Sequence, residues 1–161
     1  MVHAALDLAT EGDVIVVDAG GDLTNAVFGE LMLTTAQRKR IGGIVINGAV
    51  RDYAAIRAQR LPVYAAGITH RGPYKDGPGE VNVTIAIGGM TIAAGDLIIG
   101  DDDGVLCVPV DDADEIYIAA APDEGQNKRK PRRTRPVAGT RRRSEIDFCR
   151  WASPSNRDRR Q

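Results

Sequence analysis

Apolar residues occur in short runs that glycine-rich and acidic breaks separate. The β-branched runs at residues 13–17 (DVIVV) and 44–47 (IVIN) are predicted to be buried strands. Between them, residues 29–40 carry apolar positions at helical spacing and end in basic residues, which favours a helix. This order of strand, helix and strand predicts a right-handed βαβ unit.

The rest of the chain divides into further short elements. A helix over residues 53–59 is expected after the second strand, and a helix over residues 111–121 after the last one. A long loop rich in glycine and proline, HRGPYKDGPGE, lies between two predicted strands. The predicted strands of this part are residues 62–66, 81–87, a segment around Thr91, 97–99 and 105–108. The pattern therefore predicts an α/β fold in which a β meander follows the βαβ unit.

Charge separates the 161 residues into two parts, although the net charge is only −1. Residues 1–121 hold 8 basic and 17 acidic residues, whereas residues 122–161 hold 13 and 5. The second part has scattered prolines and no apolar periodicity, which is typical of a disordered extension. We therefore expect one α/β domain over residues 1–121 and a basic, disordered tail over residues 122–161.

Several classes of protein are disfavoured by the sequence. No apolar run approaches the ~18 residues that span a bilayer, and no signal peptide is recognisable, so we expect a cytoplasmic protein. Cys107 and Cys149 lie too far apart for a CxxC site, and His3 and His70 have no partner at metal-ligand spacing. No GxGxxG motif follows the first strand, and GDDDG (residues 100–104) is better explained as a turn than as a calcium loop.

The βαβ geometry predicts where a ligand would bind. The loop after the first strand (residues 18–22), the helix start (residues 29–32) and the segment after the second strand (residues 48–52) meet at one edge of the sheet. The free backbone N–H groups of Leu31 and Met32 would suit an anion there, beside the planar donor Arg51 and several carboxylates. This combination suggests a metal and an anionic substrate. The alternative is that Glu30 only compensates the helix dipole and that Arg51-Asp52 is a surface ion pair.

Four sequence blocks in this order resemble the RraA-like family, which includes 4-hydroxy-4-methyl-2-oxoglutarate aldolase. They are GDVIVVDAGGD, FGELM, GGIVINGAVRD and RGPYKDGPGEVNVTIAIGGMTIAAGDLIIGDDDGVLCVP, and the resemblance covers residues 2–121. It implies a swivelling β/β/α-type domain that assembles as homotrimers or hexamers. The aldolase members use Mg or Mn to cleave 4-hydroxy-4-methyl-2-oxoglutarate or 4-carboxy-4-hydroxy-2-oxoadipate to pyruvate, and they also decarboxylate oxaloacetate.

The resemblance also implies roles for individual residues. Aldolase members carry an acidic residue, twenty intervening residues and then Arg-Asp, which Glu30 and Arg51-Asp52 match here. By resemblance, Asp52 binds the metal, Arg51 contacts the pyruvyl group, and the segment of Gly29, Glu30, Leu31 and Met32 holds the substrate carboxylate. Glu30 orients water at the metal, and it replaces the aspartate that is frequent at this position.

Both ends of the chain depart from the family pattern. Family members carry further sequence before the position of Val2, so the domain is expected to be incomplete at its N-terminus. After Ala121 the family continues as a helix, whereas this chain turns to arginine and proline. No residue here takes the role of the acid that a neighbouring subunit supplies in the family.

Three functions remain open at this level. The first is a metal-dependent lyase acting on small oxo acids, supported by Glu30, Arg51 and Asp52. The second is a non-catalytic regulator of ribonuclease activity, against which the Arg-Asp pair argues, or an inactive fragment of the aldolase. The third is weak, non-specific binding of nucleic acid through the tail at residues 122–161.

Overall fold

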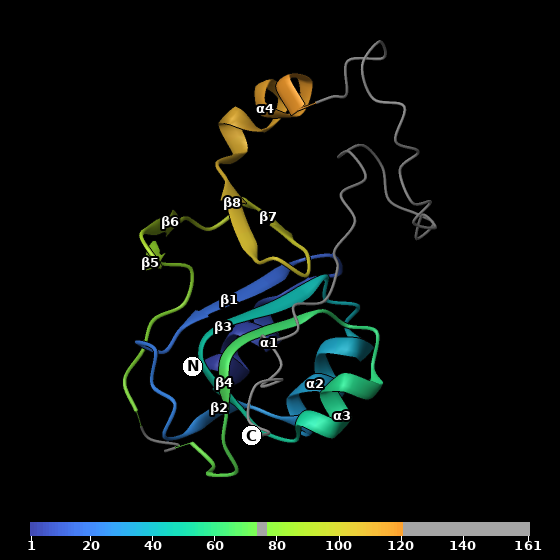
Figure 1. Cartoon of the computed structure of the whole chain (residues 1–161), viewed down its shortest axis with the longest axis vertical. Coiled ribbons are helices and arrows are strands. Elements are labelled where there is room, and N and C mark those ends of the chain that lie inside the picture. The colour runs from blue at the N-terminus through green and yellow to red at the C-terminus, as the bar shows by residue number, and fades with distance from the viewer. Residues whose placement is uncertain (74–76, 121–161) are drawn as a thin grey trace, which may run out of the picture.

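The computed structural model describes residues 1–73 and 77–120, and the predicted basic tail over residues 122–161 lies outside this range. The helices and strands alternate first and then give way to short hairpins (Figure 1). The elements are α1 (Val2–Leu8), β1 (Val14–Asp18), β2 (Ala26–Phe28), α2 (Glu30–Arg38), β3 (Gly43–Val50), α3 (Tyr53–Ala58), β4 (Val63–Ile68), β5 (Ile85–Ile87), β6 (Met90–Ile92), β7 (Leu97–Gly100), β8 (Val105–Val108), a 3₁₀ turn (Val110–Asp112) and α4 (Ala113–Ala120).

β3 is the centre of a parallel sheet of four strands. β1 pairs with its first half, from Val14 opposite Gly43 to Asp18 opposite Asn47. β2 pairs further along β3, where Ala26 lies opposite Ala49, and β4 pairs with β3 along most of its length. Because a strand has only two edges and β4 takes one, β1 and β2 share the other in succession. The predicted α/β fold with a parallel βαβ unit is confirmed.

The two faces of the sheet are buried in two separate cores. On one face, Ile44 and Ile46 pack with residues of α1, α2 and α3, among them Leu6 and Leu33. On the other face, Val45 and Tyr64 pack against the hairpins through Ile92 and Ile98. Alternate residues of a strand point to opposite faces, so a strand covered on both sides must be apolar throughout. This requirement explains the continuous run IVIN.

The structure corrects several predicted boundaries. β3 continues through Gly48 to Val50, although the strand was expected to end at Asn47, because β2 and β4 both pair with its second half. The predicted strand over residues 81–87 is reduced to Ile85–Ile87, because β6 offers it only three partners. α1 and β2 were not predicted at all.

The part after β4 forms two separate antiparallel hairpins, β5–β6 and β7–β8, and not the single meander that was expected. The predicted turn at GDDDG is confirmed, since Asp101 Oδ1 accepts hydrogen bonds from the backbone N–H groups of Asp103 and Gly104. The predicted C-terminal helix is present as the 3₁₀ turn and α4. Among the helices of the described chain, none is long and apolar enough to cross a membrane.

Candidate functional site

Arg51 and Asp52 follow β3 directly and lie beside the first turn of α2, as the βαβ geometry predicted. Asp52 begins α3, yet its carboxylate reaches back to α2, because its Oδ2 accepts a hydrogen bond of 2.9 Å from the backbone N–H of Glu30. Glu30 and Asp52 are separated by 22 positions in sequence. The contact joins the first residue of α2 to the segment after β3 at the carboxyl end of the sheet, where ligands bind in open α/β folds.

Asp52 holds its carboxylate there through an uncommon backbone conformation. Its φ of 57° and ψ of 40° place it in the left-handed region, which non-glycine residues rarely occupy. Aspartate tolerates this region better than most residues, but the conformation still costs energy and persists only where the surroundings fix it. Such outliers are concentrated at functional sites, which makes Asp52 a candidate on backbone grounds as well as for its charge.

Gly29 allows the pair to approach α2 closely. A methyl group at Gly29 would lie 2.7 Å from Asp52 Oδ2 and 2.9 Å from both Cγ and Nε of Arg51. These distances are well inside van der Waals contact. Gly29 has extended backbone with φ of −160°, so space, and not backbone freedom, is the reason for a glycine at this position.

Arg51 is held at its backbone and reaches toward a loop with its side chain. Its N–H donates to the carbonyl of Phe28, and its Nε lies 3.6 Å from Asp52 Oδ2. The guanidinium ends near Gly72, where an added methyl group would lie 3.2 Å from Nη1. About 40% of the Arg51 side chain is exposed, so the ion pair with Asp52 is partly solvated and leaves donors available for a ligand.

The first turn of α2 presents backbone donors next to Arg51. The first bond of the helix runs from the N–H of Leu33 to the carbonyl of Gly29, so the preceding N–H groups have no partner inside the helix. The one on Glu30 is bonded to Asp52, which leaves those of Leu31 and Met32 for an anion. The Glu30 residue itself is exposed.

A hydrated divalent cation fits these residues better than a cation enclosed by protein ligands. No group of three or more histidine, cysteine or acidic side chains that suits a metal occurs in the described part of the chain. Asp52, however, is 41% exposed at its side chain. Mg²⁺ prefers oxygen ligands, keeps several waters and is often held by one or two carboxylates. Asp52 is the residue that would bind it here.

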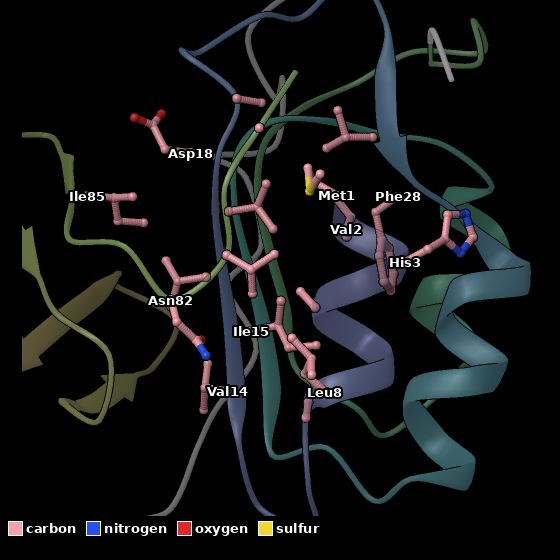
Figure 2. A pocket seen from close by; sticks show the side chains of 18 of the residues that line it. Met1, Val2, His3, Leu8, Val14, Ile15, Asp18, Phe28, Asn82 and Ile85 are labelled. Atoms are coloured by element: carbon pink, nitrogen blue, oxygen red, sulfur yellow. The ribbon is translucent and has the colours of Figure 1, made fainter. Parts of the chain in front are cut away.

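The candidate residues do not all face the same space. A cavity of about 2250 Å³ is lined by Gly29, Leu31, Met32 and Arg51, and it extends past β1 to α1 and the hairpins. Figure 2 shows this space, with Phe28 and α1 on one side of β1 and Ile85 on the other. Glu30 and Asp52 do not line it. Arg51 therefore lies between the cavity and the Asp52 carboxylate.

The loop after β1 is less available for a ligand than the sequence suggested. The backbone N–H and side-chain hydroxyl of Thr24 both donate to Asp22 and lower the pKa of its carboxyl group. Asp18 accepts hydrogen bonds from the N–H of Gly20 and from Nδ2 of Asn47. These carboxylates organise the loop itself.

Gly72 was missed as part of the site. Its segment follows β4 and is fixed to the sheet, because the Ala26 N–H donates to the Arg71 carbonyl and the Thr69 N–H donates to the Val50 carbonyl. The sequence offered one signal, a glycine in a loop longer than a normal connector. The sequence does not show that Gly72 lies beside the Arg51 guanidinium.

Comparison with known proteins identifies relatives of this chain. A protein of Halalkalibacterium halodurans named "Putative 4-hydroxy-4-methyl-2-oxoglutarate aldolase" is 39% identical over 131 residues, which is 81% of this chain and 62% of that protein. The chain thus spans about three fifths of the length of this relative.

Two solved structures with the same fold are described as RraA proteins. RraAS2 of Streptomyces coelicolor, described as an unusual member of the RNase ES inhibitor RraA protein family, is 34% identical, with a TM-score of 0.70 over 74% of this chain and 61% of that one. The RNA-processing inhibitor RraA from Thermus thermophilis is 33% identical, with a TM-score of 0.61 over 66% of each chain. The family model RraA-like, described as Aldolase/RraA, matches residues 1–107, and the chain belongs to that family.

Proposed function

We propose that this protein is a divalent-metal-dependent lyase that cleaves a small oxo acid to pyruvate, with 4-hydroxy-4-methyl-2-oxoglutarate or 4-carboxy-4-hydroxy-2-oxoadipate as substrate and oxaloacetate decarboxylation as a side reaction. One observation carries the proposal: Asp52, in a strained conformation, and Arg51 converge on the first turn of α2 across Gly29. The Asp52 carboxylate, the Arg51 guanidinium and the start of α2 are therefore neighbours, with Arg51 between the carboxylate and the cavity.

Arg51 and the amides would bind the pyruvyl part of the substrate. The carboxylate of that group would accept hydrogen bonds from the N–H groups of Leu31 and Met32, and the guanidinium would pair with its oxygens in the geometry that arginine favours. Cleavage of the carbon–carbon bond leaves its electron pair on the pyruvyl fragment as an enolate. Arg51 would stabilise that developing negative charge, which is the way such donors accelerate a reaction.

The two reactions need the same support from the protein. In the aldol cleavage, a base removes the proton of the 4-hydroxyl group, the bond between C3 and C4 breaks, and C3 of the enolate then takes up a proton to give pyruvate. In decarboxylation of oxaloacetate, carbon dioxide leaves in place of the second carbonyl fragment. Glu30 is exposed beside the Asp52 contact and is the proposed proton carrier. A divalent cation held by Asp52 would supply Lewis-acid polarisation of the keto and carboxylate oxygens.

Release of pyruvate tests this proposal directly. Folded protein is incubated with oxaloacetate, and separately with 4-hydroxy-4-methyl-2-oxoglutarate, in the presence of Mg²⁺ or Mn²⁺ and again with EDTA. The proposal expects release with the metal and none with EDTA. Folded protein that releases no pyruvate under any of these conditions would contradict it.

The chain also offers a reason to expect assembly as a homotrimer or hexamer. Leu31, in the first turn of α2, is 79% exposed although it borders the candidate site. Leu23 and Ile68, near the same edge of the sheet, are about half exposed. Covering these side chains with a neighbouring subunit would remove apolar surface from water. Sedimentation of the purified protein measures the assembly state.

A second candidate function is supported by the names of the solved relatives. The Thermus structure reported above is described as an RNA-processing inhibitor, and RraAS2 as an unusual member of an RNase inhibitor family. A non-catalytic regulator would inhibit a ribonuclease by protein contact and would not require Asp52. Unchanged inhibition by an Asp52→Asn variant, together with no pyruvate release by the parent protein, would favour this function over the lyase.

A further inference from the structure

We propose that the cavity along the outer edge of β1 binds an extended, positively charged peptide segment, which adds to the sheet as a strand. This inference is independent of the lyase proposal, since it concerns the end of the cavity remote from Arg51. It depends on the backbone of β1, the two apolar cores that flank it, the segment that covers it and the charge of the lining.

The backbone of β1 offers unpaired hydrogen-bonding groups. β1 pairs with β3 on one edge, and no other strand of the described chain pairs with it. The carbonyl of Asp13 and the N–H of Ala19 bond toward β3, and alternate residues of a strand direct these groups to the same side. Val14 and Val16 therefore direct their N–H and C=O groups away from β3. Such an edge is a template for another strand.

Both faces of an added strand would meet apolar surface. Val14 and Val16 pack against the core that includes Tyr64 and Ile98. Ile15 belongs to the opposite core, against which Val17 packs. Figure 2 shows this division, with Asn82 and Ile85 on one side of β1 and Met1, Val2 and Leu8 on the other. A segment with consecutive β-branched residues would bury side chains on both sides, as β3 does.

The segment of residues 77–83 restricts which occupants can enter. Gly79 approaches Met1 so closely that an added methyl group would lie 2.5 Å from Met1 Cγ. The two walls of the cavity therefore touch at this point. Among the described residues, no hydrogen bond joins residues 77–83 to another part of the chain. Because Met1 and Gly79 narrow the cavity at this point, the occupant that we propose is a single extended chain and not a folded second copy.

The charged side chains that line the cavity favour a positively charged partner. Five carboxylate side chains line the cavity, and Arg51 is its one basic side chain other than His3 within the described residues. These carboxylates are Glu11, Asp13, Asp18, Glu80 and Asp96. Glu11 forms an ion pair with Arg40, and the other carboxylates outnumber the single positive charge of Arg51. Lysine or arginine at the ends of an apolar segment would complement this field.

The size of the cavity agrees with a peptide occupant. Its volume of about 2250 Å³ exceeds the range of roughly 300–1000 Å³ that is usual for small ligands. The proposed oxo-acid substrate would occupy only the end at Arg51. The length of β1 would remain available to a chain of several residues.

Capped synthetic peptides test the inference on the whole protein. The probe has four β-branched residues at its centre and lysines at each end, and its binding is measured by fluorescence anisotropy. Two isomers carry N-methyl groups on one or the other alternating set of residues. Pairing with β1 uses only one set, so one isomer should bind at least about tenfold more weakly than the other. Equal affinities for the two isomers, or no binding of the unmodified probe, would overturn the proposal.

Protein variants test the charge argument. Glu80→Gln should weaken binding of the lysine-flanked probe by about threefold, the range expected of a solvated ion pair, whereas Glu115→Gln in α4 should not change it. A glutamate-flanked peptide with the same centre should bind more weakly than the lysine form. Equal binding of the two peptides would refute the charged partner. The protein without peptide is also examined by sedimentation and by hydrogen exchange. A dimer in which the backbone amides of Val14 and Val16 resist exchange would show that a second copy occupies the edge of β1, and this result would also refute the proposal.

Discussion

The carboxylate of Asp52 accepts a hydrogen bond from the backbone N–H of Glu30, so the residue that begins α3 also caps α2. The start of α2 has no capping side chain of its own, because its N-cap residue is Gly29. One acidic side chain therefore stabilises a helix start from outside that helix, as N-cap side chains usually do from within. The same carboxylate is the proposed metal ligand, which couples the stability of α2 to the chemistry of the site.

Replacing Asp52 separates these two roles. Asp52→Asn keeps an oxygen that can accept the bond from the Glu30 N–H, so we expect a small change in the free energy of unfolding. Asp52→Ala removes the acceptor and should destabilise the protein by about 1 kcal/mol, the usual effect of losing a cap. Both variants should lose metal-dependent pyruvate release. Denaturant unfolding and the pyruvate assay provide the two measurements, and an active Asp52→Asn protein would exclude Asp52 as the metal ligand.

Gly29→Ala should disturb the site while leaving the fold intact. The added methyl group would lie within 3 Å of both Arg51 and Asp52, and neither can move without breaking its contact with α2 or the ion pair between them. We expect kcat/KM for pyruvate release to fall by about tenfold or more, since small displacements at a reacting centre have large effects. Gly43→Ala is the matched control, because its nearest neighbour would be 3.7 Å away. Similar losses in both variants would show a general effect of alanine and not a local clash.

The meeting of Arg51, Asp52 and the start of α2 could be predicted because it follows from local patterns and one topological rule. The β-branched runs mark β1 and β3, the amphipathic run marks α2, and right-handed crossover places their ends at one edge. These patterns and this rule require no knowledge of long-range contacts. The structure accordingly brings the end of β3 and the start of α2 together at the predicted edge of the sheet.

The remaining features depend on contacts between distant segments. β2 has only three residues and is a strand because Ala26 and Phe28 pair with β3. The left-handed conformation of Asp52 occurs together with its hydrogen bond to the Glu30 N–H, 22 positions away, and the sequence alone gives no sign of it. The cavity is lined by residues 77–83 as well as by β1, and a loop rich in glycine and proline does not specify that these segments lie close together. Elements this short have too few residues for periodicity to identify them.

Arg51→Lys should impair the reaction although it keeps the positive charge. Lysine lacks the planar fork that spans from Asp52 to the neighbourhood of Gly72, so it cannot bind two oxygens of one group in the same way. We expect kcat/KM to fall by about a hundredfold, comparable to the loss of one oxyanion donor. Arg57→Lys is the control, because Arg57 stacks near the Tyr53 ring on α3 away from the cavity lining. An Arg51→Lys enzyme with unchanged kcat/KM would rule out paired recognition by the guanidinium.

Cys107 should resist alkylation in the folded protein up to high pH. Burial, and to a smaller extent the nearby Asp96 carboxylate, whose Oδ2 lies 3.5 Å from Sγ, together raise the pKa of its thiol to about 11. Since only the thiolate reacts, iodoacetamide should modify Cys107 slowly at pH 8 in the native state and quickly in concentrated urea, as measured by mass spectrometry of its peptide.

The same shift predicts how Cys107 affects stability. The pKa of Cys107 in the folded protein lies above its ordinary value of 9.0, so its contribution to stability is fully present below pH 9 and is lost as the pH rises toward about 11. Asp96→Asn removes the negative charge but keeps the burial, so the pKa of Cys107 should fall only part of the way toward its ordinary value. Alkylation of the native parent protein at pH 8 as fast as in urea would show that the thiol is neither buried nor coupled to Asp96.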